Sequence, residues 1–328
     1  MSDSLKELLK EQSEARVDAK IHTAARALRV DANTLSFLRG QFTELETNIV
    51  EVAFQPLRSA QMIPFVGGYD SRSEFIDYEM ETSTGVAQNV TKYSKDYPSV
   101  STFLENFRNR VLIGGASYEY NIDDIGGRPG IPSYDQVQRK AKAAAEAIAR
   151  WHDRLALNGD SASGVTGFAN NANVPVVAAI TGSWTAATTA QDMYNDLIKL
   201  LNSVSEASEG NHRPNRLALP LAAFNLISVA RLGTDSTETV MSVLQRNYPE
   251  LQMVSPWEAL KDKGVAGAGR AVAYVADPDA VAYRAVVPYR ESNPVENGFC
   301  FEIKAQGKGG GTIFYKPLSA AYMDVLAP

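Results

Sequence analysis

The strongest helical signal in the sequence lies at residues 133–158, and it constrains the fold more than any other feature. Ser133 and Gln136 have the spacing of a capping box, and Asn158 followed by Gly159 is typical of a left-handed helix end. About 25 residues at a rise of about 1.5 Å each predict a rod about 37 Å long. Its apolar side consists of Val137, Ala141, Ala144, Ile148, Trp151 and Leu155. The pattern therefore predicts an amphipathic rod with one buried side.

The residues after this helix read GDS, which raises the question of a hydrolase with Ser161 as its nucleophile. A lipase-type GDS follows a strand and needs an aspartate and a histidine near the C-terminus, but no histidine occurs after His212. The G-x-S-x-G pattern is also absent. We therefore interpret the segment as glycine-led turns, with Val165 and Phe168 buried beneath them.

Cysteine and histidine are too scarce for a metal or redox centre. Cys300 is the single cysteine, and His22, His152 and His212 are spread along the chain without a metal-binding spacing. His152 lies beside the apolar side of the long helix, where a hydrogen-bonded structural histidine is the commoner case. The sequence therefore predicts no catalytic residue, no cofactor and no metal.

Two glycine clusters, at residues 264–269 and 307–311, raise the question of a phosphate-binding loop. Neither has the P-loop pattern, and the first lacks the strand and helix that a dinucleotide site requires. Both are predicted to be flexible surface loops.

The charge balance of the chain limits which partners it can bind. The formal net charge of −6 argues against a protein that holds nucleic acid by neutralising many phosphates. A protein that only encloses DNA remains compatible with this net charge. The first 20 residues alternate in charge and lack the apolar run of a signal peptide or membrane span.

A charged N-terminal arm is predicted to begin with a helix. Ser4 and Glu7 have capping-box spacing, and a narrow apolar stripe follows them. The stripe begins with Leu5, Leu8 and Leu9. This helix needs a surface to pack on, either in its own domain or in another subunit.

Residues 67–123 are rich in strand formers and read as a long hairpin. Apolar and acidic positions alternate from Ile76 to Met80, and ETSTG at residues 81–85 is a plausible reversing turn. A two-stranded ribbon is marginal in water without a third layer, so it borrows a partner surface or is an edge hairpin of a compact sheet. The candidate inter-subunit contacts are Phe75, Ile76, Tyr78, Met80 and Tyr93 here, and Leu5, Leu8 and Leu9 in the arm.

The C-terminal half mixes helices and short strands. A helix is predicted from Thr189 with Met193, Leu197, Leu200, Leu201 and Val204 facing inward. RPNRLALP and LQMVSP read as strands, and LAAFNLISVARL and TETVMSVLQRNYP as helices. RAVAYVADPDAVAYRAV is predicted to form one hairpin, and GFCFEIKA with GGTIFYKP a second. The fold class is α+β.

The order of these parts resembles the major capsid proteins of tailed phages, which have the Hong Kong 97-like fold. The resemblance spans residues 55–326 and is most specific in GVAQNVTKYSKDYPSV and GDSASGVTGFANN. It implies five regions. They are an N-terminal arm (1–64), an extended β-hairpin loop (65–122), a peripheral domain (123–174) with a spine helix at 133–158, an axial domain (175–290), and C-terminal strands returning to the peripheral domain (291–328).

The resemblance implies a structural protein, not an enzyme, that self-assembles. Hexamers and pentamers would close an icosahedral head around double-stranded DNA, enclosed without sequence specificity. Further implied partners are scaffolding, portal and decoration proteins, without a membrane. The implied location is the virion capsid, assembled in the host bacterial cytoplasm. Lys92 and Lys95 are not assigned to a crosslink, and cleavage of the arm is not supported.

Two alternatives to a phage shell stay open. An encapsulin-type nanocompartment would use the same fold to enclose a cargo enzyme. A hydrolase using Ser161 belongs to a different class. A shell agrees with the physical pattern, since protruding ribbons and arms with little core of their own gain a layer from neighbouring copies.

Overall fold

The computed structural model describes residues 57–89, 97–121, 136–233, 237–255 and 257–327. The fold below is that of the unit formed by residues 56–328. The N-terminal arm with Leu5, Leu8 and Leu9, and Tyr93 on the ribbon, lie outside the described residues.

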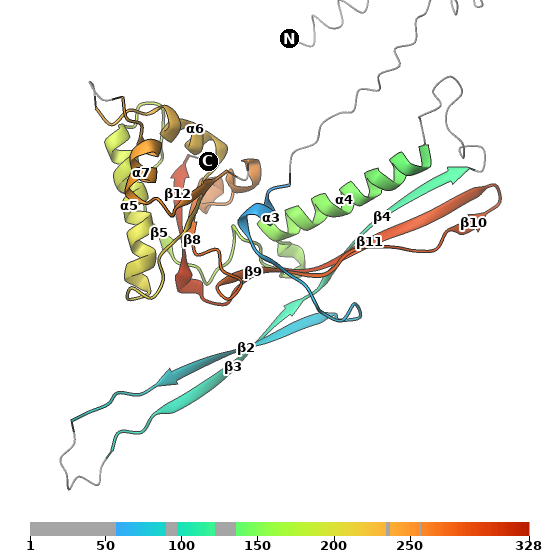
Figure 1. The fold of residues 1–328 in the computed structure, drawn as a ribbon, viewed down its shortest axis with the longest axis horizontal. Helices are drawn as coiled ribbons and strands as arrows, with labels where there is room; N and C mark the ends of the chain where they lie inside the picture. The colour runs from blue at the N-terminus through green and yellow to red at the C-terminus, as the bar shows by residue number, and fades with distance from the viewer. Residues whose placement is uncertain (1–56, 90–96, 122–135, 234–236, 256, 328) are drawn as a thin grey trace, which may run out of the picture. The chain divides into compact units, whose positions relative to one another are not determined.

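The first sheet carries the long helix. Its strands are β1 (Phe65–Val66), β4 (Leu112–Asn121), β9 (Val281–Glu291), β10 (Val295–Asn297) and β11 (Cys300–Phe314). The order is β1-β9-β11-β10, and β4 pairs antiparallel with β11 along ten residue pairs. Helix α4 (Gln136–Asn158) lies along β4 and β11, as Figure 1 shows, and buries Ala144, Ile148 and Leu155.

The end of α4 is as predicted. Gly159 has φ of 64°, and its N–H bonds the carbonyl of Leu155, so the glycine ends the helix in the left-handed region. Lys142 and Glu146 approach to 3.8 Å on the exposed side. The predicted cap at Ser133 lies outside the described residues.

Glycines let α4 approach the sheet closely. A Cβ on Gly114 of β4 would lie 2.3 Å from the Trp151 ring, and one on Gly307 of β11 would lie 2.6 Å from Nε2 of His152. The cluster at 307–311 is therefore part of a strand, with several of its residues buried, and the prediction of a flexible surface loop is wrong. Because glycine has no side chain, these positions leave room for the rings of Trp151 and His152 on α4. In the other cluster, Gly269 is also buried and begins a strand.

The inner strands of the second sheet are buried on both faces. Its order is β5 (Val176–Val177), β12 (Ala320–Leu326), β8 (Gly269–Tyr274), β6 (Arg216–Ala218) and β7 (Gln252–Val254). Along β12, Ala320 and Tyr322 join the core beside α4, whereas Ala321 and Met323 join a second core. Successive side chains of a strand point to opposite faces, so one strand serves both cores.

Three helices pack on the face of the second sheet that is turned away from α4. They are α5 (Ala190–Ala207), α6 (Leu221–Val229) and α7 (Val240–Asn247). Thr189 caps α5, because its hydroxyl accepts the N–H of Asp192 at 3.2 Å. The five side chains predicted to face inward from α5 are all buried, which confirms the helical spacing.

The ribbon is shorter than predicted. It consists of β2 (Phe75–Thr84) and β3 (Ser101–Arg110), paired antiparallel from Phe75↔Arg110 to Thr84↔Ser101. The proposed turn at 81–85 is therefore wrong, because residues 81–84 continue the strand. The two remaining strands of the predicted 65–122 loop, β1 and β4, belong to the first sheet.

Both predicted C-terminal hairpins are also wrong. The chain passes from β8 in the second sheet to β9 in the first, and β11 is one strand of 15 residues. In β11, Gly309 and Gly311 lie where the pairing with β9 shifts register, so the glycines mark irregularities and not a reversal. β12 lies in the second sheet, away from the strands that β11 joins.

Candidate assembly surfaces

Ser161 lacks the surroundings of a nucleophile. It lies in an exposed turn of 3-10 helix directly after α4. The carboxylate of Asp160 accepts the Ser163 hydroxyl at 2.6 Å and the N–H of Ala162 at 3.3 Å. As predicted, Val165 and Phe168 are buried beneath this turn.

His152 is held in place between α4 and β9. Its Nε2 is 3.0 Å from the carbonyl oxygen of Pro288, which can only accept, so Nε2 carries the proton. Nδ1 therefore accepts the Tyr283 hydroxyl at 2.6 Å. Burial lowers the pKa of His152 and raises the pKa of Tyr283. The imidazole is neutral with both nitrogens used, which confirms the prediction of a structural histidine.

Other chemistry is not assembled in the described part of the chain. Within those residues, no three His, Cys, Asp or Glu side chains lie together closely enough to hold a metal ion. Cys300 is a half-buried free thiol. None of the helices in the described ranges is both long and apolar enough to pass through a membrane.

The outer half of the ribbon exposes large apolar side chains on both faces. Phe103 is 58% exposed and Leu104 is 61% exposed, and adjacent strand residues point to opposite faces. Their cross-strand partners are Thr82 and Glu81, which give them no apolar cover. Val86, Tyr97 and Val100 extend the exposed surface toward the ribbon's end. Large exposed apolar patches mark sites of protein contact.

The inner half of the ribbon is anchored to its own chain. Ile76 is buried against Val111 and Val286, so it is removed from the predicted set of inter-subunit contacts. Tyr78 is half-buried, stacked on Phe107 at 5.3 Å and edge-on to Tyr315 at 5.1 Å. The guanidinium of Arg284 lies over the Tyr315 ring and bonds its hydroxyl.

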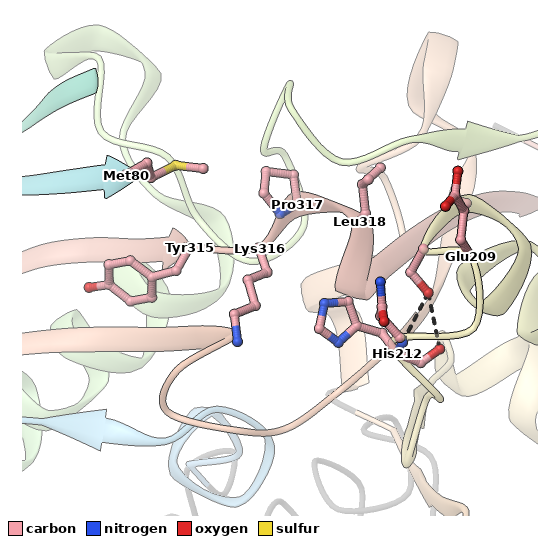
Figure 2. A pocket seen from close by; sticks show the side chains of 10 residues that line it. Met80, Glu209, His212, Tyr315, Lys316, Pro317 and Leu318 are labelled. Carbon is pink, nitrogen blue, oxygen red and sulfur yellow. Dashed lines mark hydrogen bonds between the residues drawn. The ribbon is translucent and has the colours of Figure 1, made fainter. Parts of the chain in front are cut away.

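Met80 and Phe75 lie at different surfaces. Met80 lines an open pocket of about 390 Å³ with residues 315–318 and the end of α5, and Figure 2 shows its side chain facing this pocket from the ribbon. Phe75 is about half exposed, with the Arg108 guanidinium 5.4 Å from its ring centre. Of the predicted contact residues that the structure describes, Phe75, Tyr78 and Met80 keep accessible surface.

A second group of exposed apolar side chains lies at and near the β10–β11 turn. Phe299 is 78% exposed, the largest fraction among the large apolar side chains of the described residues, and Val295 at the start of β10 is 56% exposed. Phe103, Leu104 and Phe299 were not among the contact residues predicted from the sequence. Adjacent apolar residues in a polar strand were the available signal for the first two.

Comparison with known proteins identifies this architecture. A model of the family described as "Major capsid protein" matches residues 85–326. The chain belongs to the major capsid protein family. It is a structural shell protein, located in the virion capsid.

Solved capsids show the fold of this major capsid protein. The capsid of Myoviridae phage XM1 is 16% identical, with 90% of this chain and 99% of that chain covered and a TM-score of 0.75. The capsid of the native GTA particle is 12% identical, covering 88% and 97%, with a TM-score of 0.64. The structure titled Mycobacterium phage Adephagia is 10% identical, covering 91% and 99%, with a TM-score of 0.62.

These likenesses confirm the predicted α+β class and the Hong Kong 97-like fold of the major capsid protein. No curated protein matches the chain.

Proposed function

We propose that this major capsid protein forms hexamers and pentamers that close an icosahedral head around double-stranded DNA. The ribbon is the observation that carries the proposal. It is a two-stranded element that pairs with no further strand of the described residues, and it exposes Phe103 and Leu104 on opposite faces. Two strands are marginal alone in water, so a neighbouring copy supplies the missing layer.

The contact between ribbon and neighbour is heterologous, because the ribbon of one copy lies on a different surface of the next copy. Heterologous contacts repeated around an axis generate rings when the rotation closes. Rings of six and five copies then share the same contact with a small change of angle. Many modest contacts per copy also let misplaced copies leave before the shell closes.

We further propose that the shell encloses DNA without sequence readout and assembles in the bacterial cytoplasm. Scaffolding, portal and decoration proteins complete the set of partners. An encapsulin-type compartment is the competing proposal, and membership of the major capsid protein family favours the phage head over it. The contents of native particles separate the two, since a phage head holds DNA and a nanocompartment holds one cargo protein.

Shortening the ribbon tests its role. Met80 and Glu105 are cross-strand partners, so residues 81–104 can be replaced by Asn-Gly, a two-residue hairpin turn. We expect the purified variant to keep the thermal unfolding midpoint of the unassembled wild-type protein and to form no closed particles in electron micrographs. Closed particles from this variant would exclude the ribbon as the main assembly contact. Loss of folding would place the ribbon in the core.

A further inference from the structure

An apolar pocket of about 470 Å³ lies beside the short helix α3 (Ser59–Met62). Residues of α3, β1, α4 and β9 line it, and the larger apolar contributions come from Leu57, Ala60, Phe65, Ala149, Val286 and Pro288. Of these, Leu57 and Phe65 are each 43% exposed. We call this cavity the α3 pocket. An apolar cavity of about 150 Å³ already holds a benzene ring, so the α3 pocket accommodates an aromatic side chain.

The polar side chains that line the α3 pocket are bonded to their own chain. Oδ1 of Asp153 accepts the Ser59 hydroxyl at 2.6 Å and the N–H groups of Arg58 and Ser59. Both ring nitrogens of His152 are bonded, to Tyr283 and to the carbonyl of Pro288. The rest of the lining is apolar. The α3 pocket is therefore suited to an apolar occupant.

Phe299 has the form of such an occupant. Asn297 pairs with Cys300, so Gly298 and Phe299 form a two-residue hairpin loop. Gly298 has φ of 68° and Phe299 has no positive φ, which matches a type II′ turn. This turn requires glycine at its first position but no aromatic residue at its second. At 78% exposure, Phe299 presents about 155 Å² of surface that its own copy leaves uncovered.

Phe299 cannot fill the α3 pocket of its own copy. His152 lines the pocket and lies against Gly307 of β11. Residues 299 and 307 are eight positions apart on nearly continuous strand, so about 26 Å separates Phe299 from this point. Figure 1 shows the β10–β11 turn at the end of β11 that lies away from α3. The pocket and the exposed ring can therefore meet only between two copies.

The charges around the two features are complementary. Residues 291–302, around Phe299, contain three glutamates and no lysine or arginine. Residues 57–68 and 284–290, which supply most of the pocket lining, contain three arginines and no carboxylate. Glu296 and Arg58 form no ion pair with any residue that the structure describes. Opposite charges around an apolar contact favour and orient docking.

The ribbon is a poorer match to the α3 pocket. Phe103 and Leu104 expose their side chains on opposite faces of two paired strands, so they call for flat layers that cover each face. Phe299 is a single aromatic side chain at a tight turn and fits a concave site. A rigid hairpin also presents its ring with little conformational entropy to lose on binding.

We propose that the Phe299 side chain of one copy inserts into the α3 pocket of a neighbouring copy in the shell. This inference rests on the proposed function, because it requires copies assembled side by side. The contact is heterologous, since a turn on one copy meets a pocket on the next. It is a second anchor, separate from the ribbon, and a buried aromatic anchor is a common source of binding energy in protein interfaces.

Thiol crosslinking between two marked chains tests the contact directly. Both chains carry Cys300→Ser, which removes the native thiol; one also carries Phe299→Cys and the other Ala60→Cys, at an exposed position of the pocket lining. They are co-assembled with an excess of the Cys300→Ser chain, so that most copies keep Phe299. The closed particles are treated with a short bifunctional thiol reagent, and linked peptides are identified by mass spectrometry.

We expect a crosslink between positions 299 and 60 of different chains. A matched pair with Phe103→Cys in place of Phe299→Cys should give none. Closed particles without the 299–60 crosslink would overturn the inference, and a 103–60 crosslink in its place would assign the α3 pocket to the ribbon. Failure of the unmutated protein to form closed particles would instead refute the proposed function.

Assembly thresholds test the energetic role of the same contact. Phe299→Ala should raise the protein concentration needed for assembly about a hundredfold, because most of the buried ring is lost, whereas Phe299→Leu should stay within about tenfold of the wild type. Urea unfolding of the unassembled protein should not change, since the ring is exposed. Ala60→Trp, which fills the α3 pocket, should also raise the threshold and add little to Phe299→Ala. A normal threshold for Phe299→Ala, or fully additive effects, would contradict the inference.

Discussion

Replacing Phe103 and Leu104 by serine should abolish assembly at working concentrations without unfolding the protein. An aromatic residue presents about 200 Å² of surface, so 58% exposure leaves about 115 Å² of Phe103 for a neighbour to cover, worth about 3 kcal/mol. The 61% exposure of Leu104 adds about 1–2 kcal/mol. A loss of about 4 kcal/mol per copy raises the concentration needed for assembly about a thousandfold.

The assay measures that concentration and the stability of the unassembled protein separately. Light scattering against protein concentration gives the assembly threshold, and urea unfolding below the threshold gives the stability. Since both side chains are exposed, the free energy of unfolding should change by less than about 0.5 kcal/mol. A control with Thr102→Ser and Asn106→Ser on the same strand should assemble as the wild type does. Normal assembly of the Phe103 and Leu104 variant would refute the ribbon as a contact surface.

Three further predictions concern the body. Gly114→Ala should destabilise the protein by about 1–3 kcal/mol in urea unfolding, because the new methyl group meets the Trp151 ring, whereas Gly115→Ala, with 3.8 Å of room, should be tolerated. Asp196→Ala should lower the free energy of unfolding by about 3–5 kcal/mol, because three hydrogen-bond donors lose a fully buried carboxylate acceptor. A loss below about 1 kcal/mol would contradict this, and Asp196→Asn should give a loss between that of the wild type and that of the alanine variant. The lowered pKa of His152 means that the unfolded chain binds its proton first, so stability should fall as pH drops below about 6.5, the unperturbed value. His152→Gln should flatten that part of the unfolding-against-pH curve, and an unchanged curve would exclude His152 as its origin.

The helices could be predicted from the sequence because their signals are local. The end of α4 at Gly159 and the cap of α5 at Thr189 each depend on residues within one helical turn. The five buried positions of α5 follow from helical spacing alone. The turn after α4 and the structural role of His152 were also predictable, since both followed from missing catalytic partners.

The candidate contact surface was only partly predictable. Alternation correctly indicated a strand around Tyr78. It could not show that Ile76 packs on Val111 and Val286, because both residues are distant from it in the sequence. Phe103 and Leu104 were missed because two adjacent apolar residues break the alternation that marks a buried face. Such a pair makes sense only once the structure shows that, among the described residues, the outer half of β3 has no covering layer on either face.

The sequence by itself determined the class of protein, the rod of α4 and the order of elements, because these depend on short-range spacing and on a resemblance carried by motifs. Only the tertiary structure decided which strands pair. It placed β8 and β9 in different sheets, kept β11 as one strand through its glycines, and moved β4 from the ribbon into the first sheet. Strand pairing is set by long-range contacts and by the size of side chains that meet across the core, and neither is written within a stretch of neighbouring residues.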